Sequence, residues 1–433
     1  MLKKQTVCLR QLGGGRAQEV KFGRWMSNDQ VTQEEIISRG AERTSGLVSG
    51  RHVLAIQDTT ELNYQAHAGR VSGLGTVGNG SDKGLFLHPL LAVDAADGTC
   101  LGLAHIHTWL RVEPSSVHHS QRLIEDKESY RWLEVAEAGK RCLSRADKVT
   151  IVADRESDIY DEWVRIPDER THLLTRVCRD RSMATGGMLY SWVSAQPVRG
   201  TYCFEVPSRQ GKRTAHKATL EVRFGAVTIK KPQSCRDKQA PRTVSLYVIE
   251  VKEVAQSVVG KEKPIHWRLL TTHRIESLED ALQCVAWYRW RWHIEQLFRT
   301  LKKQGLDIES SQLETGEALL KLACVAVQVA MRTMQLVLAR EGNNAAKVSD
   351  LFEPAEVFVL EKILPTLEGK TTKQKNPHST ETLAYAAWII ARLGGWKGYA
   401  SEAKPGPITM LRGLQEFEAI CYGWKLAHEK MCA

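Results

Sequence analysis

The sequence predicts an α/β fold: a mixed sheet, an all-β insertion of about a hundred residues, and a helical C-terminal region. Two apolar runs, at 53–57 and 148–153, each end in an aspartate and are separated by a segment with helical periodicity. Alternating strands and crossover helices of this kind are typical of a mixed sheet. Short β-type runs fill residues 170–272, and helical patterns follow from Ser277. These three observations carry the prediction.

The elements before residue 170 follow from local patterns. Residues 1–50 are polar, basic and helical in pattern, with a glycine-rich break at 13–15. The segment 85–112 predicts a hairpin that turns at Asp97-Gly98, because Asp-Gly favours tight β-turns. A helix is predicted over 121–144, before the strand at 148–153.

The second half changes from β-type to helical patterns. The runs THLLTRV, TYCFEVP, ATLEVRF, VTIKK, VSLYVIEV and HWRLLTT predict strands of the insertion, which is longer than ordinary loops are. A helical region extends from Ser277 to about Arg340, and a basic connector at 369–380 interrupts the mostly helical remainder. Three polar residues divide the apolar stretch 318–339, which therefore predicts a buried helix rather than a membrane span.

Composition narrows the functional class only slightly. The 433 residues are 42% hydrophobic and 25% charged, which is typical of a folded globular protein. Sixty Lys and Arg against fifty Asp and Glu give a net charge of +10, which fits a polyanionic partner but also fits many other proteins. Ten cysteines without a C-x-x-C pair indicate free thiols in a reducing cytoplasm, and they offer no zinc ligand set. Neither a signal peptide nor a membrane partner is expected.

Three carboxylates are candidates for metal binding. Asp58 and Asp154 end the two apolar runs, and Glu295 lies on a predicted helix far downstream. Carboxylates at strand ends can converge on a divalent ion, and two ions about 3.5–4 Å apart can support phosphoryl displacement. The alternative for either aspartate is a helix cap or loop start. Glu156 and Asp158 are expected to be caps or surface charges.

The predicted helix around Glu295 adds basic side chains. At about 100° per residue, the polar residues of WYRWRWHIEQLFRTLKK fall on one stripe, while its apolar residues can bury against a core. This stripe suits a metal ion beside a DNA backbone. A solvated face of Glu–Arg and Glu–Lys pairs is the open alternative. The residues of the stripe are Tyr288, Arg291, Glu295, Arg299 and Lys302.

These motifs resemble the insertion-sequence-four group of bacterial DDE transposases. The matching segments extend over nearly the whole chain from about Gly15. They are IQDTTELNY around Asp58, ADRESDIY around Asp154, the Y-R-E-K signature Tyr288-x2-Arg291-x3-Glu295-x6-Lys302, HWRLLTT at 266–272, and IARLGGW at 390–396.

The resemblance implies an RNase H-like catalytic core with a β-rich insertion. It also implies Mg²⁺ or Mn²⁺, two ions in all, held by Asp58, Asp154 and Glu295. The expected chemistry is nicking at the element's end, hairpin formation, and transfer of the 3′ end into target DNA. Expected partners are transposon-end and target DNA and a second copy of the chain, in the cytoplasm.

The resemblance further implies DNA contacts. Tyr288, Arg291 and Lys302 would grip the terminal phosphates, with Arg299 and Arg176 as further basic contacts. Trp267 would stack on a base flipped out of the hairpin. The alternatives are a core tryptophan at 267 and a surface arginine at 176.

Five regions are expected from the resemblance. The segment GGRAQEVKFGRWMSN resembles only the end of an N-terminal bundle that reads the element's ends, so much of the end-recognition domain is expected to be absent. The regions are a remnant of the end-binding domain (1–50), the first part of the core (51–169), the insertion (170–272), the second part of the core (273–345), and a helical dimerisation region (346–433).

Two other function classes remain open at this point. A truncated relative could bind full-length transposase and inhibit transposition, which the short N-terminal region favours. A different RNase H-like nuclease without strand transfer is the third class, and the insertion and the Y-R-E-K helix argue against it.

Overall fold

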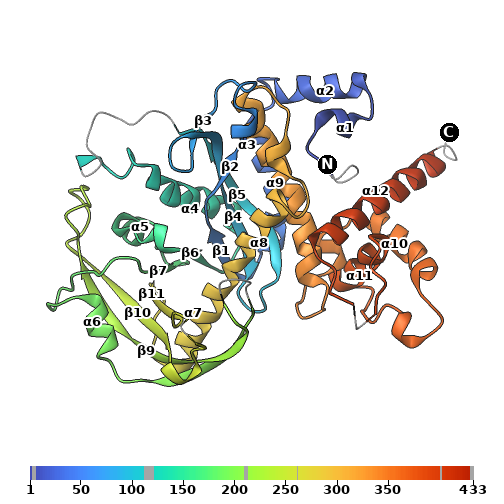
Figure 1. Ribbon diagram of the computed structural model, residues 1–433. Coiled ribbons are helices and arrows are strands. Elements are labelled where there is room, and N and C mark those ends of the chain that lie inside the picture. The colour runs from blue at the N-terminus through green and yellow to red at the C-terminus, as the bar shows by residue number, and fades with distance from the viewer. Residues whose placement is uncertain (2–5, 112–120, 209–212, 261, 400–401, 430–433) are drawn as a thin grey trace.

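The computed structural model describes the chain except for residues 2–5, 112–120, 209–212, 261, 400–401 and 430–433. A mixed sheet of eleven strands runs through it, with helices on both faces and a group of helices at the C-terminal end (Figure 1). This confirms the predicted class, a mixed α/β fold with a helical C-terminal region.

The middle of the sheet is built from five strands in the order β5-β4-β1-β6-β7. β1 pairs in parallel with β6, and β6 pairs in parallel with β7. β4 runs antiparallel to β1 on one side and to β5 on the other. Gly98, with φ of 78°, lies in the turn between β4 and β5, as the Asp-Gly pair predicts. The bounds are β1 His52–Gln57, β4 Asp82–Asp94, β5 Cys100–Trp109, β6 Lys148–Ala153 and β7 Thr171–Arg176, with the short β2 Thr60–Asn63 and β3 Gly75–Val77 beside β4.

The strands of the predicted insertion continue this same sheet, but the insertion is not all-β as expected, because it also contains the short helix α6 (Leu189–Ser194). β11 pairs antiparallel with β7, and the order continues through β10 and β9 to β8. The two runs ATLEVRF and VTIKK form one long strand, because the backbone stays extended through Gly225, where a Cβ would meet the Trp192 ring at 2.7 Å. The bounds are α6 Leu189–Ser194, β8 Gly200–Val206, β9 His216–Lys230, β10 Thr243–Glu253 and β11 His266–Thr271.

The two faces of the sheet bury separate cores. Side chains alternate along a strand, so Leu54 and Ile56 join the core beneath α7–α9, whereas Val53 and Ala55 join the core beneath α4–α6. The covering helices are α4 Arg131–Cys142, α5 Tyr160–Arg165, α7 Leu278–Trp290, α8 Trp292–Lys302 and α9 Gly316–Ala339.

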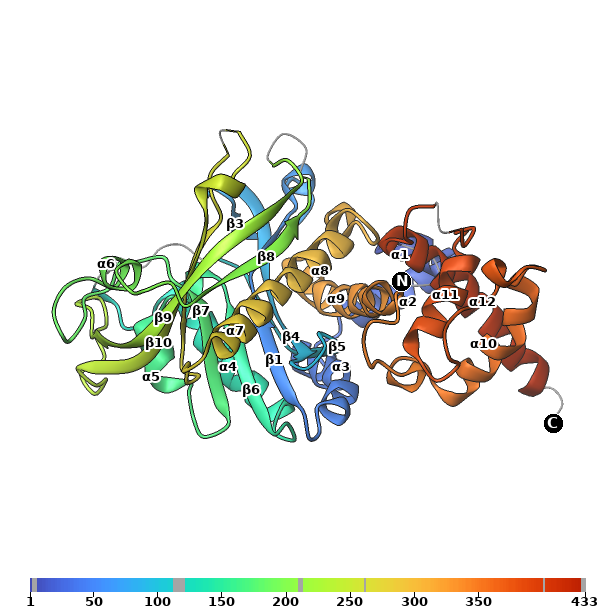
Figure 2. The same cartoon turned by 90° about the horizontal axis from the view of Figure 1, so that it is seen from below.

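The remaining helices lie at the two ends of the chain. α10–α12 gather beside α9, away from most of the strands, around a core of their own (Figure 2). α9 is long and apolar enough to cross a membrane by length and composition, but 72% of its apolar window is buried in the fold. The bounds are α1 Leu9–Gly13, α2 Arg16–Met26, α3 Gln33–Leu47, α10 Pro354–Leu367, α11 Leu383–Leu393 and α12 Pro407–Glu429.

Two predicted helices differ from the structure. The helix predicted over 121–144 begins only at Arg131, after a short 3-10 turn at Glu128–Tyr130. The helix through the Y-R-E-K signature is interrupted at Arg291, which separates α7 from α8. There the amide of Arg291 bonds Tyr288 O and the amide of Ile294 bonds Arg291 O, so the chain makes tighter i→i+3 bonds.

Candidate active site

Two aspartates emerge side by side from the parallel strands β1 and β6. Ile56 pairs with Val152 in the parallel register, and Asp58 and Asp154 each follow two residues later. Residues two apart share a face of a strand. Both aspartates therefore continue the row that begins with Leu54 and Ile56, toward α7–α9. The same amino-acid pattern that ends each strand brings the two carboxylates to one edge.

Asp58 is crowded by like charges. Its carboxylate accepts the Thr59 amide (2.8 Å) and Arg291 Nη1 (2.7 Å). Burial raises the pKa of Asp58 to about 7; Asp154 and Glu295 add to the rise, and Arg291 opposes it. Asp154 accepts the Glu156 amide and so caps a short 3-10 turn. Asp154 is therefore a capping residue, and it also lies beside Asp58.

Glu295 reaches the same region from the first turn of α8. The buried side of this helix anchors it, since Ile294, Leu297 and Leu301 are fully buried. Glu295 lies on the opposite side with its side chain 37% exposed, and its carboxylate is 3.5 Å from Arg291 Nη2. The partial positive charge at the N-terminal end of a helix stabilises a carboxylate in its first turn. Three acidic residues separated by 96 and 141 positions in sequence are thus electrostatic neighbours.

A guanidinium lies among these three carboxylates. Burial lowers the pKa of Arg291, but Tyr288, Asp58, Asp154 and Glu295 together raise it, so Arg291 stays charged. Within the described ranges, no group of three or more His, Cys, Asp and Glu side chains is arranged to hold a metal ion. The carboxylates share a neighbourhood without forming a ligand shell. Arg291 instead pairs with two of them, Asp58 and Glu295.

The residues nevertheless fit a divalent cation chemically. All three side chains offer oxygen donors, which Mg²⁺ and Mn²⁺ prefer. The raised pKa of Asp58 reflects burial and crowding of negative charge that a divalent ion would relieve.

Three of the predicted DNA contacts lie together beside the aspartates. Tyr288 is only 5% exposed, and burial raises its pKa, while the charges of Arg291 and Arg176 oppose the rise. Trp267 is half-buried on β11, where its ring meets Tyr288 edge-to-face at 5.8 Å. Arg176 ends β7 and donates to His266 O at 3.4 Å.

The two remaining basic residues lie further along α8. Arg299 is exposed, and Lys302 pairs with Glu309 at 3.5 Å. The predicted stripe is thus divided by the break at Arg291: Tyr288 is buried on α7, and the residues from Glu295 onward lie on α8.

Of the two acidic residues that follow Asp154, one was predicted incorrectly. Glu156 is an exposed charge paired with Arg131 at 2.7 Å, as expected of a surface residue. Asp158 is instead buried, pairs with Arg181 at 2.6 Å, and accepts the amides of Cys178 and Arg179. Burial of this carboxylate is possible because each oxygen is hydrogen-bonded.

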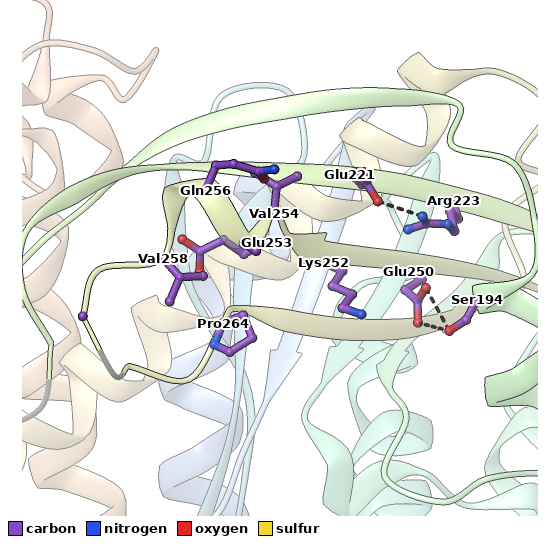
Figure 3. Close-up of a pocket in the computed structure, with 12 residues that line it drawn as sticks. Ser194, Glu221, Arg223, Glu250, Lys252, Glu253, Val254, Gln256, Val258 and Pro264 are labelled. Carbon is purple, nitrogen blue, oxygen red and sulfur yellow. Dashed lines mark hydrogen bonds and ion pairs between the residues drawn. The ribbon is translucent and has the colours of Figure 1, made fainter.

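Cavities near and far from the carboxylates differ in character. One of about 510 Å³ opens beside the residues that follow Asp154, and Arg131, Arg155 and Arg179 contribute to its lining. Another, of about 580 Å³, lies over β9 and β10 next to α6 (Figure 3). There Glu250 accepts bonds from Ser194, His266 and Arg268, so its charge is satisfied within the insertion. We therefore assign the second cavity no part in the site.

Sequence reasoning missed a set of buried polar residues behind the aspartates. His88 is fully buried on β4 and bonds both neighbours of Asp58, Gln57 and Thr59. The only sequence signal was a histidine within the apolar run LFLHPLLAV.

A family model described as a transposase DDE domain matches residues 86–327, more than half of the chain. The chain belongs to the transposase DDE family. The match includes Asp154 and Glu295, while Asp58 precedes it.

The solved structures that align with the chain include the cryo-EM structure of a piggyBac transposase synaptic complex with hairpin DNA. The identity is 11% and the TM-score 0.32, over 75% of this chain and 59% of that one. The chain thus spans less than two thirds of the length of that protein.

Proposed function

We propose that this chain is a transposase that cleaves DNA at the ends of an insertion sequence and joins them to a target. Asp58, Asp154 and Glu295 are its catalytic carboxylates. The observation that carries the proposal is that Asp58 and Asp154, which follow β1 and β6, and Glu295 on α8 are electrostatic neighbours, with the pKa of Asp58 raised to about 7. Membership of the transposase DDE family supports the same reaction class.

The three carboxylates would hold Mg²⁺ or Mn²⁺, two ions in all. The bound ions would supply an activated attacking hydroxyl and stabilise the leaving 3′ oxygen. The chain's own side chains perform the rest. Arg291 moves from Asp58 toward a DNA phosphate, for which its planar donors are suited. Tyr288 and Arg176 hold the DNA beside the aspartates, and Arg299 and Lys302 bind the backbone along α8.

The core is proposed to be RNase H-like, in the insertion-sequence-four group. The order β5-β4-β1-β6-β7, with only the last three strands parallel, supports the core. The Y-R-E-K residues around the break between α7 and α8 support the group. We further propose that the enzyme acts in the cytoplasm on transposon-end and target DNA as a homodimer, to which α10–α12 contribute.

Glu295→Ala tests the catalytic assignment. Nicking, hairpin formation and strand transfer should all fall together, by more than the roughly 10–100-fold typical of residues that only support metal ligands. Stability should change by less than about 1 kcal/mol, because a partly exposed ion pair contributes little. The assay uses DNA spanning the inverted repeats that flank the gene, with Mg²⁺ and then Mn²⁺.

Glu317→Ala is the matched control for that variant. Like Glu295, Glu317 lies in the first turn of a helix, here α9. It pairs with Lys321, four residues later, at 3.0 Å. It should retain nicking. Cleavage by Glu295→Ala in Mn²⁺ would place the catalytic carboxylate elsewhere. Wild-type protein that binds the ends without nicking them would identify an inhibitory relative instead.

Trp267→Ala tests the hairpin step separately. A tryptophan face recovers about 1–3 kcal/mol of stacking per flipped base, so hairpin formation should slow roughly ten- to a hundredfold. The first nick should persist, because it needs no flipped base. Trp267 also contacts Tyr288, so the melting temperature is measured alongside. Equal loss at both steps with a lowered melting temperature would assign Trp267 to packing alone.

A further inference from the structure

A continuous hydrogen-bond chain lies behind the two aspartates, on the other face of the sheet. Gln57 and Thr59 flank Asp58, and side chains alternate along a strand. Their side chains consequently point toward α4 and α5, while Asp58 points toward α8. Gln57 is fully buried and Thr59 half-buried, so neither serves as a free surface group.

His88 joins these two flanking residues. Its Nδ1 lies 2.7 Å from Thr59 Oγ1, and its Nε2 lies 3.1 Å from Gln57 Oε1. The ring packs edge-to-face on Trp132 at 4.6 Å. Burial lowers the pKa of His88 well below its ordinary value, so the ring is neutral, with one donor and one acceptor.

The partners fix which nitrogen donates. The amide nitrogen of Gln57 donates to Glu162 at 3.4 Å, so its oxygen faces His88 and can only accept. His88 Nε2 must then carry the proton, and Nδ1 accepts from the Thr59 hydroxyl. The same hydroxyl accepts from Arg131 Nε at 2.9 Å. Every group from Arg131 to Gln57 has a compatible role.

Both ends of this chain return to the segment that follows Asp154. Arg131 donates to Glu156 at 2.7 Å. At the other end, the Glu162 carboxyl accepts hydrogen bonds from the Gln57 amide nitrogen and the Ser157 hydroxyl. Asp154 itself binds the Glu156 amide. The residues around Asp58 and those around Asp154 are thus connected by two routes, one through Arg131 and Glu156 and one through Gln57, Glu162 and Ser157.

We propose that Thr59, His88 and Arg131 are positioning residues that fix the separation of Asp58 and Asp154 for metal binding. This inference rests on the proposed function, since it assumes that the aspartates bind a metal. The structural reason is general: groups that hold metal ligands in place commonly set affinity, and removing them weakens binding about 10–100-fold.

Thr59→Val and Thr59→Ser form the decisive pair. Valine keeps the shape of threonine but removes the hydroxyl, whereas serine keeps the hydroxyl. Mn²⁺ affinity of the whole protein is measured without DNA by electron paramagnetic resonance of free Mn²⁺, and half-saturating Mg²⁺ is measured in the nicking assay. Thr59→Val should weaken both about 10–100-fold. Thr59→Ser should restore most of the affinity.

Ser194→Ala is the control for a purely structural effect. It removes a hydroxyl that bonds the buried carboxylate of Glu250, far along the sheet (Figure 3). It should lower the melting temperature and leave Mn²⁺ affinity unchanged. Wild-type Mn²⁺ affinity in Thr59→Val, with only a lower melting temperature, would overturn the inference.

A second variant tests the same inference in case Thr59→Val does not fold. Arg131→Met removes the bonds to Thr59 and Glu156 from a residue at the cavity wall, and the same criteria apply to it. If wild-type protein binds no Mn²⁺, the proposed function fails, and this inference with it. If wild-type protein binds Mn²⁺ and neither variant weakens it, only the inference fails.

Discussion

The two ends of the parallel strands carry opposite chemistry. Where β1 and β6 finish, Asp58 and Asp154 lie together with Arg291 between α7 and α8. Where the strands begin, three histidines meet instead: His52 on β1, His172 on β7 and His273 after β11. His52 Nε2 and His273 Nε2 lie 2.8 and 2.7 Å from Thr150 Oγ1, and the rings of His172 and His273 stack at 4.1 Å.

The two ends also titrate in opposite directions. Burial, with nearby cationic groups, lowers the pKa of His52 to about 4 and of His273 to about 2. The histidine end therefore becomes more stable as pH rises toward 6.5. Burial and like charge raise the pKa of Asp58 to about 7, so the carboxylate end becomes less stable as pH rises from about 3.8 to 7. A neutral cluster with internal bonds indicates a structural role, whereas charge left in conflict indicates a ligand site.

The largest expected effect follows Asp58→Asn. Asparagine cannot ionise, so without metal this variant should lack the part of the fall in unfolding free energy between pH 4 and 7 that comes from Asp58. At pH 8 and with a chelator present, the variant should be more stable than wild type. Its nicking activity with Mg²⁺ should nevertheless be more than about a hundredfold lower. Mg²⁺ should stabilise wild type only. Urea unfolding at pH 5 and 8, with chelator and with Mg²⁺, measures the stability of both proteins. Equal stabilisation of both proteins by Mg²⁺ would remove Asp58 from the ligand set.

A smaller effect, at the opposite end, is expected of His273→Ala. The variant loses the stacking with His172, the contact with Trp287 and the bond to Thr150. The unfolding free energy at pH 8 should fall by about 1–3 kcal/mol, within the usual range for such losses. Mn²⁺ affinity and nicking per folded molecule should not change. Weaker Mn²⁺ binding without destabilisation would contradict the division between the two ends.

The smallest effect concerns the DNA partner. Lys302→Gln on α8 should reduce the slope of log affinity against log salt by about 0.9, the contribution of one phosphate contact. Lys148→Gln is the control, because Lys148 is exposed at the histidine end. That variant should keep the wild-type slope. A filter-binding titration over several salt concentrations compares them, and equal slopes for the two variants would refute the DNA face assigned to α8.

Sequence patterns predicted the carboxylate end better than its surroundings. Two apolar runs ending in aspartate place Asp58 and Asp154 at one edge as soon as the strands pair in parallel, which needs only local periodicity. The break at Arg291 has no such signal, because every residue around it suits a helix. Only the tertiary packing of the two helices, with Tyr288 buried on α7 and Leu297 buried on α8, shows where the helix is interrupted.

Local sequence patterns do not predict long-range polar networks. His88 and His273 are far in sequence from most of their partners, and a single histidine in an apolar run does not reveal whether it binds, packs or titrates. The extension of β9 through Gly225 was missed because glycine normally weakens a strand, and its value here, room for Trp192, exists only after folding.

The long separation between the carboxylates has a consequence for the newly made chain. Asp58 and Glu295 are 237 residues apart, the sum of the 96 and 141 residues that separate Asp58 from Asp154 and Asp154 from Glu295. At roughly 5–20 residues per second of synthesis, about 12–50 seconds pass between their emergence. During the last 141 of these residues the growing polypeptide has both aspartates but not Glu295, so under the proposed function a ribosome-bound fragment lacks one of the three catalytic carboxylates.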